Sequence, residues 1–122
     1  MSLLGKLGTF AQSLASSATS FERVKDMAPN QVGVYIMRYQ GKVMYVGRAI
    51  EDRSGQSTKG LRKRLQEHWR GAANCKPELH RHRREISVTL RPCQSVAEAK
   101  ALEAELIRRF NTVEEGWNLR YE

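Results

Sequence analysis

GVYIMRYQGKVMYVG, residues 33–47, is the stretch of sequence that decides the fold. It alternates between the two faces of an extended chain, is rich in β-branched and aromatic residues, and is interrupted only at Gln40-Gly41. This pattern predicts two antiparallel strands joined by a tight turn. The length of the turn then decides which side chains share a face of the hairpin.

Two turn lengths are compatible with this hairpin. A two-residue loop at Gln40-Gly41 would place Tyr35 and Tyr45 on opposite faces. A three-residue loop, residues 39–41, ends in a left-handed position that suits glycine, and it places Tyr35 directly opposite Tyr45. Their β-carbons would then lie about 5 Å apart, so that both hydroxyls can reach one ligand. We expect the three-residue loop because it also completes an apolar second face, formed by Val34, Ile36, Met44 and Val46.

The composition indicates one domain. A chain of 122 residues has room for one modest core. It contains only two cysteines, and residues 1–18 lack the charged start and apolar stretch of a secretory signal. No segment approaches the ~20 apolar residues that span a bilayer. We therefore expect a reduced, cytoplasmic setting and no membrane partner.

The excess positive charge is confined to one part of the chain. The net charge is +8, and residues 41–91 alone hold 13 Lys/Arg against 5 Asp/Glu, so the charges of the remaining residues cancel. Such clustering favours a polyanionic partner, with nucleic acid ahead of a membrane surface. A solvated basic surface without any partner is the alternative.

Residues 1–20 are expected to form a helical extension of a domain that comprises residues 21–122. Apolar side chains recur in this extension at helical spacing, at Leu3, Leu7, Phe10 and Leu14. We expect the resulting amphipathic helix to pack on the domain or on a second copy of the chain. Self-association through residues 1–18 is therefore an open alternative.

Residues 60–71, GLRKRLQEHWRG, predict a helix with two different faces. An apolar stripe is assigned to the core, at Leu61, Leu65 and Trp69. Arg64 and His68 are four residues apart and emerge together at the edge of this stripe. Arginine suits a phosphate ligand because its charge is permanent and its planar fork binds two oxygens at once. The other basic side chains of the helix are expected to face solvent: Arg62, Lys63 and Arg70.

Residues 96–110 predict a second long helix. Ser95 and Glu98 form a capping box at its start. Its buried stripe is expected at Ala99, Leu102, Leu106 and Phe110. Glu103 lies at the margin of that stripe, where a carboxylate is costly unless it is paired or bound to a cation. Glu105, by contrast, faces solvent.

Two further elements complete the domain. Residues 21–27, capped by Thr19 or Ser20, predict a short helix, and residues 86–90 predict a third strand. The segment CKPELHRHRRE, residues 75–85, contains cysteine and histidine but no fourth ligand at a usual zinc spacing. We therefore expect a basic, phosphate-facing segment rather than a zinc site.

The two halves of the hairpin, Gly33-Val34-Tyr35 and Tyr45-Val46-Gly47, resemble the signature of the GIY-YIG nuclease family, with valine for isoleucine in each half. Further residues follow in the order that the family uses: Arg64 with His68 one turn later, Glu103 within an LExxLI stretch, and Asn118 after an aromatic residue. That aromatic residue is tryptophan where the family commonly has tyrosine, and the usual preceding proline is absent. The resemblance implies an α+β fold, with a small three-stranded antiparallel sheet flanked by helices, as a stand-alone nuclease domain.

The resemblance also implies hydrolysis of phosphodiester bonds with one divalent cation, Mg²⁺ or Mn²⁺. Glu103 would bind this cation, and Arg64 would neutralise the charge that develops on the phosphate. Tyr35 would act as the water-orienting base with help from His68, while Tyr45 would bind phosphate or the water shell of the cation. An unperturbed phenol has a pKa near ~10, so we expect the cation, Arg64 and His68 to lower the pKa of Tyr35. Asn118 would complete the site.

Nucleic acid is the expected partner, with DNA favoured over RNA. The side chains expected to contact it are Arg48, Arg53, Lys59, Arg62, Lys63 and Arg70. Two of these belong to a polar loop, residues 51–59, which is longer than in the family and is expected to be an insertion beside the site. A mobile surface loop without substrate contact is the alternative for this segment. A catalytically inactive nucleic-acid-binding module and a protein-interaction domain are the alternatives. A pure binding module needs the basic surface but not Glu103, which favours the enzyme.

Overall fold

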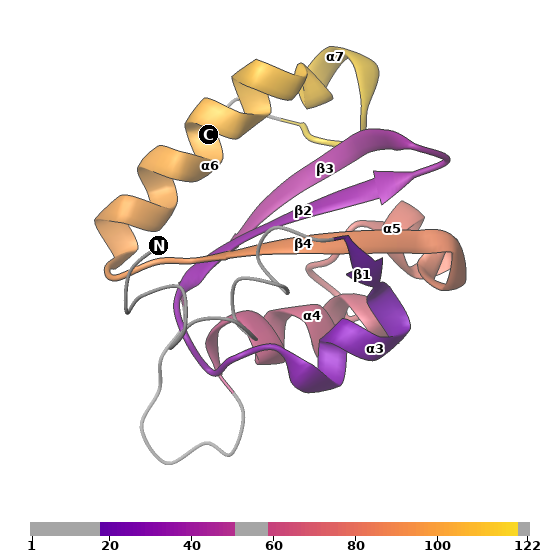
Figure 1. The fold of residues 1–122 in the computed structure, drawn as a ribbon. Helices are drawn as coiled ribbons and strands as arrows, with labels where there is room; N and C mark the ends of the chain where they lie inside the picture. Colours follow the sequence, from indigo (N-terminus) through magenta and orange to yellow (C-terminus); the bar gives the residue numbers. More distant parts are fainter. Residues whose placement is uncertain (1–17, 51–58, 120–122) are drawn as a thin grey trace, which may run out of the picture.

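The computed structural model describes residues 18–50 and 59–119 (Figure 1). They form one antiparallel sheet with strand order β1-β4-β2-β3 and helices on both of its faces. The elements follow the chain as β1 (Thr19–Ser20), α3 (Phe21–Met27), β2 (Gly33–Tyr39), β3 (Lys42–Ala49), α4 (Gly60–Arg70), α5 (Pro77–Arg81), the 3₁₀ helix η1 (Arg83–Glu85), β4 (Ile86–Pro92), α6 (Val96–Phe110) and α7 (Thr112–Glu115). In this part of the chain, no helix is long and apolar enough to cross a membrane.

The sheet has four strands, so the expected number of three was wrong. The additional strand is β1, in which Thr19 pairs with Val88 and Ser20 pairs with Ser87 of β4. A strand of two residues is too short to show alternation, which is why the sequence pattern did not indicate it. The amphipathic helix expected near the N-terminus falls on residues 1–17, outside the described residues.

The hairpin turn has two residues, so the prediction of a three-residue loop was wrong. Tyr39 pairs with Lys42, and the loop residues Gln40 and Gly41 have φ values of 53° and 79°. Two consecutive left-handed residues are typical of a type I′ turn, whose twist matches that of the flanking strands. Glycine was expected to have a positive φ, but glutamine at the preceding position gave no such signal.

A β-bulge in β3 nevertheless brings the two tyrosines to one face. Beyond the bulge Met37 pairs with Tyr45 and Tyr35 pairs with Gly47, so that Met44 is the extra residue. Because of this extra residue, Tyr35 and Tyr45 lie diagonally on the same face rather than directly opposite, with 6.2 Å between their ring centroids. The shared face was predicted correctly, but the register that produces it was not.

Each face of the sheet is covered by its own helices (Figure 1). On one face α3 and α4 pack against β2 and β4 around a core that includes Tyr35, Met37, Leu61, Leu65 and Leu90. On the other face α6 covers a second core, formed by Val34, Ile36, Val46, Ala99, Leu106 and Ile107. The apolar stripes expected from the sequence are thus buried, apart from Trp69, Leu102 and Phe110, which are half-buried.

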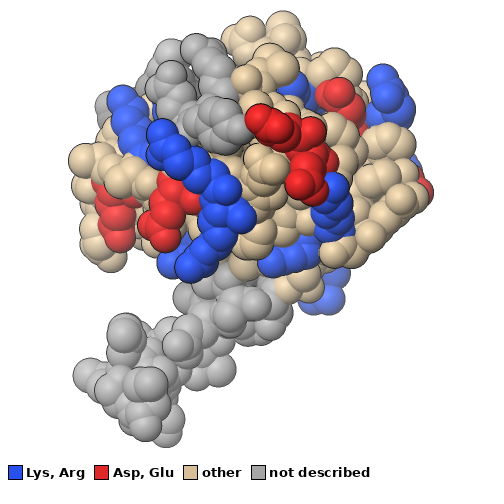
Figure 2. All heavy atoms as spheres, turned by 90° about the horizontal axis from the view of Figure 1, so that it is seen from above, with Lys and Arg blue, Asp and Glu red and all other residues tan. Residues whose placement is uncertain are grey.

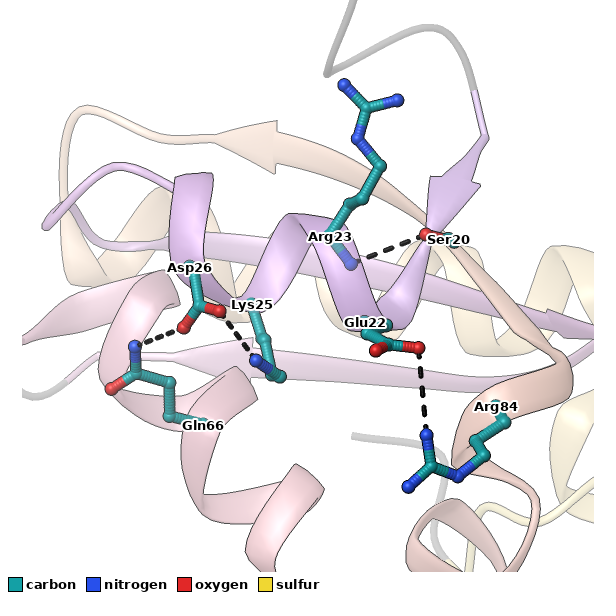
Figure 3. A network of polar contacts seen from close by, with 7 residues as sticks. All are labelled: Ser20, Glu22, Arg23, Lys25, Asp26, Gln66 and Arg84. Atoms are coloured by element: carbon teal, nitrogen blue, oxygen red, sulfur yellow. Dashed lines mark hydrogen bonds and ion pairs between the residues drawn. The ribbon is translucent and has the colours of Figure 1, made fainter.

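Both predicted helix caps are present. The hydroxyl of Ser20 accepts a hydrogen bond from the backbone N–H of Arg23, 3.3 Å away, and that of Ser95 accepts one from Glu98 at 3.1 Å. Polar contacts then hold α3 in place, since Asp26 bonds to Gln66 of α4 and Glu22 pairs with Arg84 of η1 (Figure 3). These contacts link α3 to η1 and to α4, the helix that carries Arg64 and His68.

Candidate active site

The centre of the site is a buried contact between β2 and α4. The hydroxyl of Tyr35 lies 2.7 Å from Nε2 of His68, and neither side chain is exposed to solvent beyond 1%. The ring of Tyr35 lies directly over Gly47, because a Cβ at that position would be 2.3 Å from Cζ and Oη of the tyrosine. Glycine at the end of the second motif is therefore required by the packing of the tyrosine in the first.

Burial keeps both partners of this contact neutral. It lowers the pKa of His68 to about 3, with a further contribution from the positive charge of Arg64. It also raises the pKa of Tyr35 well above its ordinary value, and Tyr45 adds to this effect. Arg64 acts in the opposite direction on Tyr35 but is outweighed by burial. Arg64 and His68 therefore do not by themselves lower the pKa of Tyr35, as part of the expectation had it, and with these side chains the phenol is protonated at neutral pH.

Arg64 is held beside this pair by the loop that follows α4. Its guanidinium donates to Glu67 at 3.1 Å, to the carbonyl oxygen of Asn74 at 3.2 Å and to Sγ of Cys75 at 3.5 Å. Burial disfavours its charged form, but the neighbouring Tyr35 and the hydrogen bond to Glu67 raise its pKa above the ordinary value. Arg64 is therefore a permanent, partly desolvated positive charge.

Glu103 is buried, as expected for a carboxylate at the margin of the apolar stripe, and only 6% of it is exposed. Its Oε1 atom accepts a hydrogen bond of 2.8 Å from Nη1 of Arg48. Arg48 comes from β3 and faces α6 because it pairs with Val34, whose side chain belongs to that core. This ion pair joins the second long helix to the edge strand of the sheet.

Two adjoining cavities lie around the free edge of β3. The smaller, of about 280 Å³, is lined by four charged residues, Arg48, Lys63, Arg64 and Glu67, and by Ala49, Ile50, Gly60 and Asn74. The larger, of about 450 Å³, is lined by Tyr45, Asn74, Cys75, Lys76, Pro77, Glu103, Asn118 and Leu119. Asn74 borders both, so we treat the two cavities as one cleft. Side chains from opposite faces of the sheet meet in it because β3 has no neighbouring strand on that side.

Asn118 closes this edge of β3 and has a structural role. Its side-chain amide donates to the carbonyl oxygen of Val46 at 2.9 Å, and its Oδ1 accepts from the N–H of Val46, also at 2.9 Å. The hydroxyl of Thr112 donates to the same Oδ1 at 2.7 Å. The amide thus supplies the two hydrogen bonds that a further strand would make to Val46.

The residues expected to bind nucleic acid are dispersed. Lys63 lines the smaller cavity, Lys59 precedes α4, and Arg70 is exposed at the end of that helix. Arg62, which was expected to face solvent, is half-exposed, because its Nε donates to the carbonyl oxygen of Ala28 at 2.7 Å. Arg53 lies outside the described residues, as do residues 51–58 of the polar loop.

Sequence reasoning missed one wall of the cleft, the loop from Asn74 to Pro77. Its one signal in the sequence is Gly71, which ends α4 in the left-handed conformation with a φ of 74° and turns the chain back. The rings of His82, Tyr39 and Trp117 form a cluster in which each contacts the other two, with centroid distances of 4.4 to 5.8 Å. Among the described residues, no group of three or more His, Cys, Asp or Glu side chains is arranged to hold a metal ion.

The donor chemistry at Glu103 nevertheless fits a single hard cation. The buried residue Glu103 and Tyr45 line the same cavity, and its volume leaves room for water and phosphate oxygens as further ligands. A Mg²⁺ ion commonly binds in this way, through one or two carboxylates with water and substrate oxygens in the other positions.

Comparison with known proteins supports the fold. No family model and no curated protein matches the chain. Its structure is similar to that of the GIY-YIG N-terminal endonuclease domain of UvrC from Thermotoga maritima, in a point mutant bound to its catalytic divalent cation, with 25% sequence identity and a TM-score of 0.61 over 82% of this chain and 96% of that one. The same domain bound to magnesium has 25% identity and a TM-score of 0.58 over 75% of this chain and 90% of that one.

Proposed function

The chain folds as a GIY-YIG domain, and from this premise we propose that it is a metal-dependent endonuclease that hydrolyses phosphodiester bonds of nucleic acid, with DNA favoured over RNA. The observation that carries the proposal is the convergence of Tyr45, Arg64 and Glu103 on one cleft, with Tyr35 and His68 directly behind it. These residues are spread over the chain from β2 to α6. A binding surface alone does not require a buried carboxylate in such a cleft.

Glu103 would hold the cation, Mg²⁺ or Mn²⁺, with Tyr45 beside it. When bound, the ion would supply a Lewis acid for the phosphate and a more acidic water. Arg48 occupies Oε1 of Glu103 in the structure described here, so this ion pair has to rearrange or share the carboxylate.

Arg64 would stabilise the negative charge that develops on the phosphate. Its charge is permanent, it lines the smaller cavity, and it is partly desolvated. Electrostatic stabilisation is stronger in such a setting than in water, because the surrounding dielectric constant is lower. Lys63 borders the same cavity and would help to hold the adjoining phosphate.

Tyr35 would orient the attacking water as a neutral hydroxyl. This role requires the cleft to open onto the tyrosine, which is 1% exposed and lines neither cavity. The raised pKa of Tyr35 disfavours a phenolate, and the lowered pKa of His68 disfavours an imidazolium. An anionic tyrosine base is therefore disfavoured. His68 would fix the direction of the hydroxyl through their 2.7 Å contact. Tyr45 lines the larger cavity and would contact the phosphate or the water shell of the cation.

One observation favours the second candidate, a nucleic-acid-binding module without catalysis. The contact between Arg48 and Glu103 already neutralises the buried carboxylate without a cation. Under that alternative the cleft would bind phosphate, and cleavage would be absent with any divalent ion.

Substitution of Glu103 by glutamine tests the proposal, because it keeps size and helix propensity but removes the charge. Cleavage of a labelled DNA in Mg²⁺ should fall by at least ~10³-fold, equivalent to about 4 kcal/mol of transition-state stabilisation. Affinity for nucleic acid in chelator should hold or rise slightly, since a repulsive carboxylate has gone.

Glu105→Gln is the matched control, because Glu105 is an exposed residue two positions away on the same helix. It should remain active, and equal losses in the two variants would indicate damage to α6. Full activity in Glu103→Gln would exclude this cation site and favour the binding module.

A further inference from the structure

Arg48 is in contact with both halves of the cleft. Its guanidinium lies 2.8 Å from Oε1 of Glu103, a residue that lines the larger cavity. Arg48 itself lines the smaller cavity together with Lys63 and Arg64. The group that neutralises the proposed cation ligand therefore also borders the cavity to which we assign a phosphate.

The ion pair between Arg48 and Glu103 lies in a partly buried position, where electrostatic interactions are stronger than at the surface. The side chain of Glu103 is 8% exposed and that of Arg48 is 31% exposed, so the contact is only partly screened by water. A buried carboxylate that loses its counter-charge is strongly destabilised. The backbone of Arg48 belongs to the edge strand β3 and is held by pairing with Val34. Only the side chain of Arg48 would therefore move if its guanidinium left Glu103 for another partner.

We propose that Arg48 couples the binding of the cation to the binding of nucleic acid. In the free protein Arg48 neutralises Glu103 and repels a divalent cation, so that the affinity for the cation is low. A phosphate that enters the smaller cavity draws the guanidinium away, and a cation then replaces it as the counter-charge of Glu103. The inference rests on the proposed function and makes the assembly of the cation site dependent on the substrate.

Linkage makes this coupling reciprocal and therefore measurable from either side. If bound nucleic acid raises the affinity for the cation by some factor, the bound cation must raise the affinity for nucleic acid by the same factor. Such factors are typically ~5–150-fold. Arg48 is a positioning residue in this scheme, since it acts through Glu103 and not on the reacting atoms. Binding constants, rather than activity, are the appropriate measurement.

Binding of Mn²⁺ alone, followed by the electron paramagnetic resonance signal of the free ion, tests the first half. Arg48→Gln should bind Mn²⁺ at least ~5-fold more tightly than the wild type. Arg48→Lys retains the charge and should stay close to the wild type. Arg108→Gln, the same change at an exposed position of α6, should have no effect. Equal or weaker Mn²⁺ binding by Arg48→Gln with a native circular dichroism spectrum would overturn the inference.

The second half uses the wild-type protein and does not depend on the stability of an Arg48 variant. Fluorescence anisotropy of a labelled duplex oligonucleotide should show tighter binding in Ca²⁺ than in chelator at matched ionic strength. No such gain in the wild type, or an equal gain in Glu103→Gln, would also overturn it. If Glu103→Gln binds Mn²⁺ as well as the wild type does, the cation is not on Glu103 and the proposed function fails at that point instead.

Discussion

At the scale of single residues, Gly47 is determined by its contact with Tyr35. A Cβ at position 47 would lie 2.3 Å from the tyrosine ring, closer than side chains approach in proteins. Gly47→Ala must therefore displace the ring and disturb its bond to His68. We expect a loss of ~1–3 kcal/mol in the free energy of unfolding, the usual cost of overpacking a core. Urea denaturation measures this loss, and a nuclease assay should show that cleavage falls as well.

Gly41→Ala is the control for this change. Gly41 has a φ of 79°, so alanine is strained there, but no atom lies within 4 Å of the added Cβ. The variant should lose about 1 kcal/mol of stability, the cost of a left-handed backbone, while the folded protein retains its activity. If activity fell equally in both variants, reduced stability would explain the result without any role for the tyrosine.

His68 should make stability depend on pH in the acid range. Burial lowers its pKa to about 3 in the folded protein, against ~6.5 in an unfolded chain. Between these values the unfolded state binds the additional proton, so the free energy of unfolding falls as pH falls from ~6.5 to ~3, by at most ~1.4 kcal/mol per pH unit from this group. Urea titrations of wild type and His68→Gln should show a smaller slope in the variant over that window. Identical slopes would mean that His68 is not buried in its neutral form.

At the scale of secondary-structure elements, the helices were predictable because their signals are local. The capping serines of α3 and α6 and the apolar stripes of α4 and α6 are encoded within each segment. The hairpin register was not, because it depends on a distant segment. The bulge at Met44 directs a carbonyl oxygen away from the ladder, and the backbone N–H of Trp117 donates to it at 2.6 Å. Nothing in residues 33–47 shows that this partner exists.

In the candidate site, too, some features have local sequence signals and others depend on contacts between distant segments. The identities of its polar residues were predictable, since tyrosine, arginine and glutamate follow one another in the order that the GIY-YIG family uses. Their pairing was not, because the contact of Arg48 with Glu103 joins an edge strand to a helix far away in the sequence. The burial that raises the pKa of Tyr35 is likewise a property of the packed core, not of the motif.

The role of Asn118 can be tested by substitution, because its side chain bonds to the edge of β3 where a further strand would otherwise pair. Asn118→Ala would leave the N–H and C=O groups of Val46 without these partners. Because both groups are buried, we expect a loss of ~1–3 kcal/mol in the free energy of unfolding. Thermal denaturation measures it, and affinity for DNA in chelator, below the melting temperature, should be preserved. Asn30→Ala removes an exposed bond to the N–H of Lys59 and should cost much less. A large loss of DNA affinity in folded Asn118→Ala would instead place the asparagine in contact with substrate.

At the scale of the whole molecule, the sheet separates two differently charged halves. Helices α3, α4, α5 and η1 together carry nine Lys/Arg and five Asp/Glu, whereas α6 and α7 carry three and five. On the face seen from the side of α6 and α7, basic and acidic side chains are interspersed (Figure 2). The basic half is also the one that supplies Arg64 to the cleft, with His68 buried behind it. Nucleic acid should therefore approach from the side of α4.

The division between an N-terminal extension and the domain stays a prediction, as does self-association through residues 1–18.

Salt dependence tests this direction of approach. A basic surface releases counterions when it binds phosphates, so affinity falls linearly with salt on a double-logarithmic plot, with a slope set by the number of contacts. Lys63 lines the smaller cavity and Arg70 is exposed on the same helix, so the double variant Lys63→Gln/Arg70→Gln should flatten the slope by ~1–2 units. Fluorescence anisotropy of a DNA duplex in chelator, between ~50 and ~200 mM salt, gives the slope directly. The variant Lys100→Gln/Arg108→Gln removes the same charge from exposed positions of α6, and its slope should equal that of the wild type. Equal flattening by both pairs would mean that net charge, and not the α4 side of the sheet, governs binding.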